Sequence, residues 1–247
     1  ATGMKGLSPK AKMGTRGAPR SRRETGTRNS RLRKGAPPHG SIHANVYAAM
    51  KHALMRGSYK PGQKITIRGV ATSLGTSATP VREAIRRLIA EGAVEHLHAG
   101  RARLPDLTQQ RLAEITEVRV ALETLAARHA ALHMTNDEIA NLESIQATLE
   151  RARDRKDYSA YLANNEAFHF AYYRACAMPN LLRVIESMWL QAGPYLTLLL
   201  PAMRGIDLHA SAIDAARRHD GEAAAAAIEE DIRRAATRLA TLLEPAA

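Results

Sequence analysis

The sequence predicts a mainly α-helical protein with two folded parts. These are an N-terminal winged helix-turn-helix domain (residues 41–105) and a C-terminal all-α antiparallel bundle (residues 106–247). Residues 41–105 contain three short segments of helical apolar periodicity and then a strand-turn-strand pattern. Residues 106–247 contain about six longer helical patterns and no convincing strand, which is typical of a helical bundle.

The net charge changes sign along the chain. The 247 residues include 36 Lys and Arg against 24 Asp and Glu, so the net charge is +12. Residues 1–40 carry +10, residues 41–105 carry +7 and residues 106–247 carry −5. Basic domains attract polyanions and acidic ones repel them. The charge therefore favours nucleic-acid binding by the first folded part.

Cysteine content and hydropathy indicate the compartment. The single cysteine, Cys176, cannot pair within the chain, which fits a reducing compartment. It lies on an apolar stripe, so we expect a buried, unreactive thiol. No apolar run approaches the ~20 residues that span a bilayer, and the basic N-terminus lacks the apolar core of a secretory signal. We expect a cytoplasmic protein that does not bind membranes.

Residues 1–40 are rich in Gly, Pro, Ser, Arg and Lys and lack apolar periodicity. This composition predicts a disordered basic tail. Two interpretations stay open, a merely solvated tail and an arm that adds affinity for phosphate groups.

The first folded part begins with a helix over residues 41–57, which ends at a glycine. A Pro61-Gly62 turn leads to a second helix over residues 66–75, and residues 93–105 read as two strands around a turn at Ala99-Gly100. The apolar positions expected to be buried in the three helices are Val46, Met50, Leu54 and Met55; Ile67, Val70, Ala71 and Leu74; and Val81, Ala84, Ile85, Leu88 and Ile89.

The third helix, in "GTSATPVREAIRRLIAEGAV" (residues 75–94), begins with a proline. Proline is tolerated in a first turn, and Ser77 or Thr79 could cap the helix. The positive end of a helix suits a phosphate, and a recognition helix places its N-terminal residues against the bases of the major groove. Arg82, Arg86 and Arg87 would lie on its outer face. Alone they could be a solvated face; with the wing and the local charge they predict DNA binding.

These residues resemble a known family. "YKPGQKI…VATSLGTSATPVREAIRRLIAEGAVE" resembles the DNA-binding domain of GntR-family bacterial transcription regulators. "ITEVRVALETLAARHAA" (residues 115–131) resembles the start of the FadR-type C-terminal effector domain (FCD). The two resemblances cover about residues 41 to 240.

The resemblance implies which residues contact DNA. By position they are Arg68, Ser77, Ala78, Thr79, Arg82 and the wing around Gly100 and Arg101. Many members have arginine where this chain has Ala78. Alanine can contact a thymine methyl group but cannot grip a guanine, so the operator should differ from the common one of the family.

The C-terminal part is expected to have helices at about residues 108–133, 135–154, 157–177, 180–199, 205–218 and 221–243. Breakers separate them at Asn136, the Met178-Pro179-Asn180 turn, Pro201, Gly205 and Gly221. In residues 157–177 the expected inner face comprises Tyr158, Leu162, Phe168, Tyr172 and Cys176.

Polar residues interrupt the apolar stripes of three of these helices. They are Asn165 and His169, His209, and Asp231. A buried carboxylate is unfavourable unless it is paired or bound to a metal, and these four side chains could surround a cation. The alternative is a hydrogen-bonded polar core.

The FCD resemblance implies the same four positions as metal ligands. Metal-binding members have Asp and His four apart, a second His on a later helix and a third His 22 residues beyond it. Here Asn165 replaces the Asp and Asp231 replaces the last His. A divalent ion (Zn²⁺, Mn²⁺ or Ni²⁺) is expected, and the loss of one imidazole favours a harder ion such as Mn²⁺.

Other candidates are weaker. His129 and His133 are four apart, but no third ligand is indicated, so they read as a solvated pair. Arg119 could face an effector carboxylate or pair with Glu123 on its own helix. Tyr172, Tyr195 and Arg204 are further candidates for an effector pocket.

Together these features predict a transcription regulator rather than an enzyme. A homodimer would bind a palindromic duplex DNA operator and respond to a small organic-acid effector, with or without a metal. The rivals are the same regulator with a metal-free polar pocket, a metalloenzyme tethered to DNA, and a nonspecific DNA binder.

Overall fold

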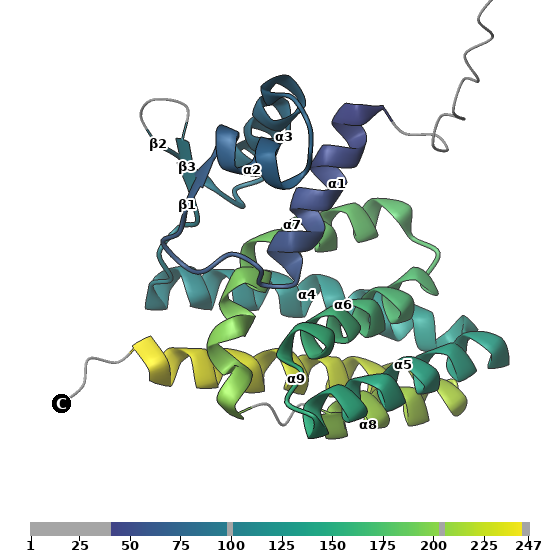
Figure 1. Cartoon of the computed structure of the whole chain (residues 1–247). Coiled ribbons are helices and arrows are strands. Elements are labelled where there is room, and N and C mark those ends of the chain that lie inside the picture. The colour runs from purple at the N-terminus through teal and green to yellow at the C-terminus, as the bar shows by residue number, and fades with distance from the viewer. Residues whose placement is uncertain (1–40, 98–100, 203–205, 244–247) are drawn as a thin grey trace, which may run out of the picture. The chain divides into compact units, whose positions relative to one another are not determined.

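The computed structural model describes residues 41–97, 101–202 and 206–243 (Figure 1). The predicted tail of residues 1–40 lies outside the described residues. The first part contains α1 (Ile42–Met55), β1 (Lys64–Thr66), α2 (Ile67–Ser73), α3 (Ala78–Ala90), β2 (Glu95–Leu97) and β3 (Arg101–Arg103). The second part contains α4 (Gln109–His133), α5 (Asn136–Asp154), α6 (Tyr158–Arg174), α7 (Pro179–Leu196), the 3₁₀ helix η1 (Thr197–Ala202), α8 (Ile206–Arg217) and α9 (Gly221–Leu243). The predicted mainly α fold with a small wing is confirmed.

The wing is a three-stranded antiparallel sheet with the order β1-β3-β2. Ala102 of β3 lies between Ile65 of β1 and His96 of β2, and both Ile65 and Ala102 are buried. The two strands around the wing turn are confirmed, whereas β1 was not predicted. It spans three residues and buries only the central one, which is too short a run to show a strand period.

Helices α1 and α3 pack against each other and carry most of the predicted core of the winged part. One expectation there was wrong, and one was confirmed in part. Leu74 is 40% exposed, because α2 ends at Ser73 and Leu74 is its C-cap. Ser77 is the N-cap residue of α3 but makes no side-chain capping bond, and Thr79 lies inside the helix.

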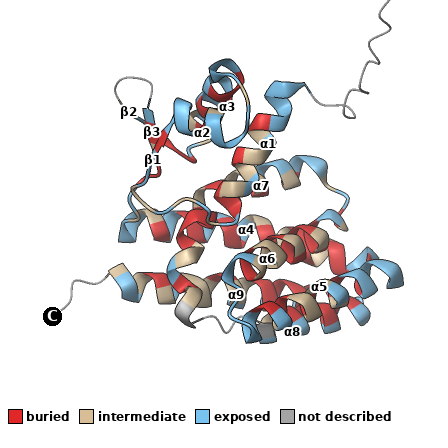
Figure 2. Ribbon diagram, in the orientation of Figure 1, coloured by how far each residue is buried: buried red, intermediate tan, exposed pale blue. Residues whose placement is uncertain are grey.

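The bundle buries the facing sides of its helices (Figure 2). Helix α4 packs along α9, α8 packs on α9, and α5 packs on α6. The predicted helix bounds lie within three residues of the observed ones, and α7 continues through Pro194, as its predicted range of residues 180–199 implies. Two of the predicted breakers differ, since Pro179 begins α7 instead of forming a turn and η1 contains Pro201. Tyr158 is 42% exposed, against the predicted inner face, since it is the first residue of α6.

The winged part contacts the bundle through α1, which packs on α7. A Cβ atom on Gly193 would lie 2.7 Å from the Cα of Met55, so glycine permits this close approach. Glu166 of α6 accepts hydrogen bonds from Nδ1 of His52 (2.8 Å) and Nε of Arg56 (2.6 Å).

None of the helices in the described part of the chain is long and apolar enough to cross a membrane.

Candidate DNA interface and metal centre

The start of α3 presents polar side chains outward from a fixed base. Pro80 and Val81 are buried against the core of the winged part, whereas Ser77, Ala78 and Thr79 are exposed. The rigid start therefore anchors the helix end whose backbone N–H groups are available to a phosphate or a base edge.

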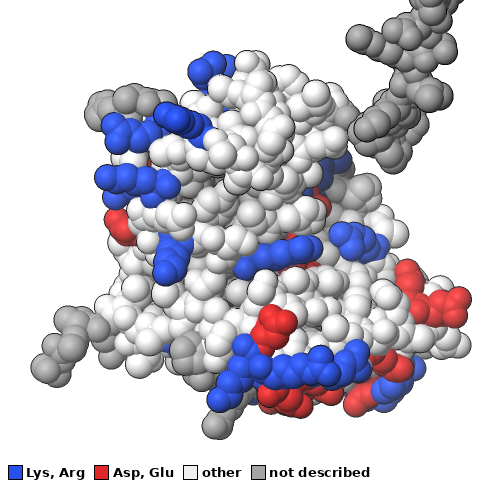
Figure 3. Space-filling view, in the orientation of Figure 1, with Lys and Arg blue, Asp and Glu red and all other residues white. Residues whose placement is uncertain are grey.

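The basic side chains predicted to meet DNA are on the surface. Arg68 of α2, Arg82 of α3 and Arg101 of β3 are all exposed, and Gly100 lies outside the described residues. Lys and Arg side chains gather on the winged part near its strands, whereas the lower helices carry both signs of charge (Figure 3).

Two of the three α3 arginines also serve the winged part itself. Arg87 Nε lies 3.1 Å from Glu91, and its guanidinium stacks 3.8 Å over the Tyr47 ring. Arg86 lies 3.6 Å from Glu83. Arg82 and Arg86 have the more outward positions, and Arg87 fastens α3 to α1.

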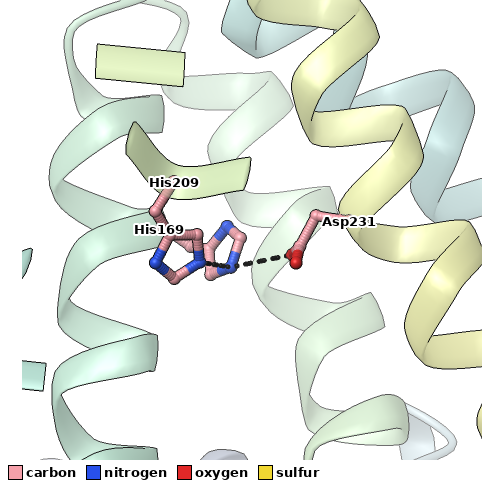
Figure 4. A group of neighbouring side chains, drawn as sticks. All are labelled: His169, His209 and Asp231. Carbon is pink, nitrogen blue, oxygen red and sulfur yellow. Dashed lines mark hydrogen bonds and ion pairs between the residues drawn. The ribbon is translucent and has the colours of Figure 1, made fainter. Parts of the chain in front are cut away.

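Three of the four predicted metal ligands converge inside the bundle. His169 comes from α6, His209 from α8 and Asp231 from α9, and their side chains point toward one another (Figure 4). The two Nε2 atoms are 3.3 Å apart, and Asp231 Oδ2 lies 3.4 Å from His169 Nε2. All three ligand atoms lie within 4.8 Å of one another. Ligands of a tetrahedral zinc ion are about 3.3 Å apart, given Zn–N bonds near 2.05 Å.

The hydrogen bonds of His169 fix its tautomer. Tyr173 donates its hydroxyl proton to the buried Glu123 carboxylate at 2.6 Å, because a carboxylate can only accept. Burial and the charge of Glu123 raise the pKa of Tyr173, so this proton stays in place. The Tyr173 oxygen, 3.0 Å from His169 Nδ1, must then accept the Nδ1 proton. With its Nδ1 proton bonded to Tyr173, the neutral ring has its lone pair on Nε2, the atom that faces Asp231; a proton on Nε2 would instead be donated to Asp231.

His209 reaches the same state by another route. The Gln146 side chain donates a hydrogen bond from Nε2 to Glu150. Its Oε1 therefore faces His209 Nδ1 at 3.2 Å and accepts a hydrogen bond from it. The His209 ring also stacks on Phe168 with a centroid separation of 4.0 Å. His209 Nε2 thus also carries a lone pair toward the centre.

With neutral rings, two lone pairs and a carboxylate face one another, an arrangement that a cation between them would stabilise. A proton is poorly suited to His209, because burial and the neighbouring His169 lower the pKa of His209 from 6.5 to about 3. Burial would raise the pKa of Asp231, but the bond from His169 and the charges of His209, His169 and Arg119 outweigh it, so the pKa is lowered and the carboxylate stays charged. The donor set fits a divalent metal ion.

A cavity of about 60 Å³ lies beside this centre. Its wall is formed by Arg119, Tyr161, Asn165, His169, Trp189, Leu196, Leu199, Asp231, Ile232, Arg234, Ala235 and Arg238. Asn165 therefore borders the same space as two of the proposed ligands. Arg119, Arg234 and Arg238 line it; Arg119 is paired with Glu123, and Arg234 is paired with Asp207 and Glu230. Burial raises the pKa of Tyr161 to about 12, so its hydroxyl can donate a hydrogen bond to a ligand there.

The structure places the other candidates differently. Arg119 is bonded to Glu123 through Nε at 2.6 Å, as the pairing interpretation predicts, and it also lines the cavity, so it stays a candidate for an effector carboxylate. Tyr172 donates to the carbonyl of Ala212 and is not among the residues that line the cavity, so we leave it out of the effector site. Tyr195 donates to the Pro105 carbonyl and lines a second cavity.

Two further predictions concern Arg204 and the histidine pair of α4. Arg204 lies outside the described residues. His129 is half-buried and His133 is exposed.

Sequence reasoning missed the residues that hold the two histidines. Glu123 appeared only as a helical partner of Arg119, and Tyr173 and Gln146 were not considered. The signal for Tyr173 was present, because it lies four residues from His169 and hence on the same side of α6. Gln146 gave no such signal, since it comes from a different helix, α5.

With this geometry in view, comparisons with known proteins decide the family. Residues 42–103 match the model of bacterial regulatory proteins of the gntR family, and residues 114–234 match the FCD domain. The HTH-type transcriptional regulator McbR of Escherichia coli (strain K12) is 32% identical over 174 residues, which are 70% of this chain and 79% of McbR. The chain belongs to the GntR family.

Other members agree with this assignment. The probable D-xylose utilization operon transcriptional repressor of Paenarthrobacter nicotinovorans is 28% identical over 186 residues, which are 72% of this chain and 80% of that protein. The solved structure of E. coli McbR/YncC has a TM-score of 0.79 at 28% identity and covers 83% of this chain and 100% of its own. This GntR-family chain is thus a DNA-binding transcription regulator with an FCD effector domain and not an enzyme.

Proposed function

We propose that this GntR-family regulator binds a palindromic operator as a homodimer and responds to a small carboxylate that binds beside a divalent metal ion. Residues 41–105 act as the DNA-binding domain, and residues 106–247 bind the effector and dimerise. The observation that carries the proposal is the convergence of the His169 and His209 lone pairs with the Asp231 carboxylate next to a cavity lined by arginines.

The metal would be held by Nε2 of His169 and His209 and by the Asp231 carboxylate, with the Asn165 amide oxygen as a further, weaker ligand. Such an ion supplies positive charge for a carboxylate at the bottom of the cavity. Arg119 and Tyr161, both on the wall, would bind the same carboxylate by hydrogen bonds. Zn²⁺, Mn²⁺ and Ni²⁺ all accept this mixture of imidazole and oxygen ligands, and the two oxygens favour Mn²⁺.

DNA would be bound through the exposed start of α3 and the wing. Ser77, Ala78, Thr79 and Arg82 face base edges in the major groove, with Ala78 against a thymine methyl group. Arg68, with Arg101 and Gly100 of the wing, binds phosphates and thereby sets the register.

The outer side of α4 supports a dimer. Val118 and Leu132 are 38% and 46% exposed, and Leu122 and Leu125 are half-buried. With the half-buried His129, these positions are separated alternately by four and three residues, which is the spacing of a helix–helix seam. We call these five residues the α4 seam. Two copies of α4 packed along it would give the two-fold symmetry that a palindromic operator requires.

Helix α6 links the effector site to the DNA-binding domain. Asn165 and His169 border the cavity, while Glu166, between them in sequence, is bonded to His52 and Arg56 of α1. A shift of α6 on binding metal and effector would therefore move α1. Regulation requires that the effector bind more tightly to one of the two resulting arrangements.

The test uses the full chain, stripped of metal by chelation. Duplexes are selected from a random library, and affinity for the selected site is measured by fluorescence anisotropy with metal alone and then with metal and small carboxylates. We expect a palindromic site and a change in affinity of roughly 5- to 150-fold on adding both ligands.

The control is Asp231→Ala, which should bind the site without responding to either ligand. A site that is not palindromic, or an equal response in both proteins, would refute the proposal.

A further inference from the structure

We propose that the effector is a monocarboxylate with a short apolar chain, because a second cavity, the apolar branch, extends from the effector site toward the segment that joins the two domains. This inference rests on the proposed function. The branch lies among α4, α7 and α9 and has a volume of about 20 Å³. It shares Arg119, Leu196, Ile232 and Ala235 with the wall of the cavity beside the metal centre. The two spaces are therefore neighbours, and the proposal is that one ligand occupies both.

The wall of the branch offers carbon atoms to a ligand. Leu112, Leu239 and Ala236 line it and belong, with Tyr195, to a small apolar cluster separate from the main core. Its polar groups already have protein partners. The Thr116 hydroxyl donates to the Leu112 carbonyl at 2.7 Å, and the Tyr195 hydroxyl donates to the Pro105 carbonyl at 2.9 Å. A polar substituent in the branch would lose its water without gaining a partner, so an apolar one is preferred.

The volume limits the length of the chain. A space of 10–15 Å³ holds about one water-sized group, so the branch holds about two carbon atoms beyond those in the first cavity. A long acyl chain would not fit without displacing Leu112 or Leu239. A di- or tricarboxylate would place a charge against apolar carbon. These two limits leave a short monocarboxylate.

Because of the position of the branch, the length of the effector's carbon chain would also affect regulation. Leu107, in the segment between β3 and α4, lines it, and Tyr195 is bonded to Pro105 of the same segment. An occupant of the branch therefore touches the connection between the DNA-binding and effector domains. A carboxylate too short to enter the branch would bind at the metal without that contact.

The test is a titration calorimetry series on the full chain loaded with Mn²⁺ or Zn²⁺, with acetate, butyrate, hexanoate and octanoate as ligands. Burial of each CH₂ group should tighten Kd about fourfold, which makes butyrate roughly 15-fold tighter than acetate. Octanoate should bind no more tightly than butyrate, because its chain exceeds the branch.

Matched variants fill or enlarge the branch. Ala236→Leu should raise the Kd of butyrate to that of acetate and leave the Kd of acetate unchanged. Unchanged binding of acetate would also show that the site is folded. Ala226→Leu makes the same change at an exposed position of α9 and should alter neither ligand. Leu239→Ala should move the preference toward hexanoate, and it provides an independent test if Ala236→Leu does not fold.

The possible results separate the two proposals. Equal affinity for acetate, butyrate and hexanoate, or equal weakening of acetate and butyrate in Ala236→Leu, would overturn the apolar branch while leaving the metal-dependent effector site intact. Binding of metal without binding of any carboxylate would overturn the carboxylate effector and the branch together.

Discussion

Tyr173 sets the protonation state of a proposed metal ligand without touching the metal. Its hydroxyl donates a hydrogen bond to Glu123 (2.6 Å), and its oxygen accepts a hydrogen bond from Nδ1 of His169 (3.0 Å). Partners of this kind typically change metal affinity 10- to 100-fold. Tyr173→Phe should therefore weaken metal binding by roughly that factor, as measured by competition with a chromophoric chelator.

The neighbouring Tyr172 offers a matched control. It is equally buried, but its hydroxyl donates to the Ala212 carbonyl, away from the metal centre. Tyr172→Phe should leave metal affinity within about threefold of the original value. If both variants lose the same affinity, packing of the aromatic rings explains the loss, and the proposed role of Tyr173 is wrong.

His209 should make the metal-free protein sensitive to acid. Its folded-state pKa is about 3 and its ordinary pKa is 6.5, so between these values the unfolded chain binds a proton that the folded chain does not. The free energy of unfolding therefore falls as pH falls through this window, by about 2 kcal/mol between pH 7 and pH 5. Above pH 6.5 this contribution is fully present, and below pH 3 its loss is complete.

Urea unfolding at pH 7 and pH 5, with chelator present, measures this loss. Because carboxylates also titrate in acid, the comparison is with His209→Gln, which cannot take up the proton. The variant should lose about 2 kcal/mol less than the original protein over the same interval. An equal loss in the two proteins would show that His209 is not kept neutral by the fold.

At the scale of residues, the sequence could indicate the proposed metal ligands but not the side chains that orient them. His169, His209 and Asp231 were visible because each interrupts an apolar stripe. Tyr173 was passed over, although it lies four residues from His169, because the predicted apolar stripe of this helix ran through Tyr172. Helix α6 packs against α4, α5 and α7, so more than one of its faces is buried. Its burial pattern follows the tertiary packing and not the period of 3.6 residues alone.

Helices α6 and α7 each have one side toward the effector site and one toward α1. Trp189 of α7 lies 5.0 Å from the His169 ring, centroid to centroid, and Gly193 one turn later packs against the backbone of Met55. Glu166 provides the corresponding contact from α6. Both helices could therefore transmit a change at the metal centre to the DNA-binding domain.

Glu166→Gln tests this transmission, because it keeps the shape of the side chain and removes the charge that holds His52 and Arg56. Metal affinity should stay within about twofold, whereas the effect of metal and carboxylate on DNA affinity should fall at least threefold, given couplings of roughly 5- to 150-fold. Anisotropy titrations with and without ligands measure both quantities. Glu143→Gln removes the carboxylate of α5 that pairs with Arg217 of α8, away from α1, and serves as the control. Unchanged coupling in Glu166→Gln would exclude Glu166 from the pathway.

At the scale of elements, most helix bounds followed from caps and apolar periods. Thr135 and Glu138 form the capping box that begins α5, for example. The exceptions are few. Helix α7 ends at Leu196, three residues before its predicted end, and the chain continues as the 3₁₀ helix η1. Strand β1 exists because β3 is available to pair with it.

The α4 seam determines the predicted assembly of the whole molecule. A charge at Leu125, in the middle of the seam, would be buried between two apolar helices in the dimer. Leu125→Glu should therefore convert the dimer to a monomer in multi-angle light scattering and remove high-affinity binding to the full palindrome. Binding to a single half-site should persist.

Val184→Glu is the matched control, since Val184 is an exposed apolar residue of α7 (48% exposed) outside the seam. It should remain dimeric. A dimer that survives Leu125→Glu but not Val184→Glu would place the interface on α7.

The most direct test of the metal centre is an anomalous difference map at the zinc edge from crystals of the full chain grown with Zn²⁺. We expect one strong peak per chain, about 2.0–2.2 Å from Nε2 of His169, Nε2 of His209 and a carboxylate oxygen of Asp231. If the crystals show no peak there and a direct hydrogen bond between the two imidazoles, the centre is a polar core without a metal. The proposed metal-dependent response to carboxylates would then be wrong.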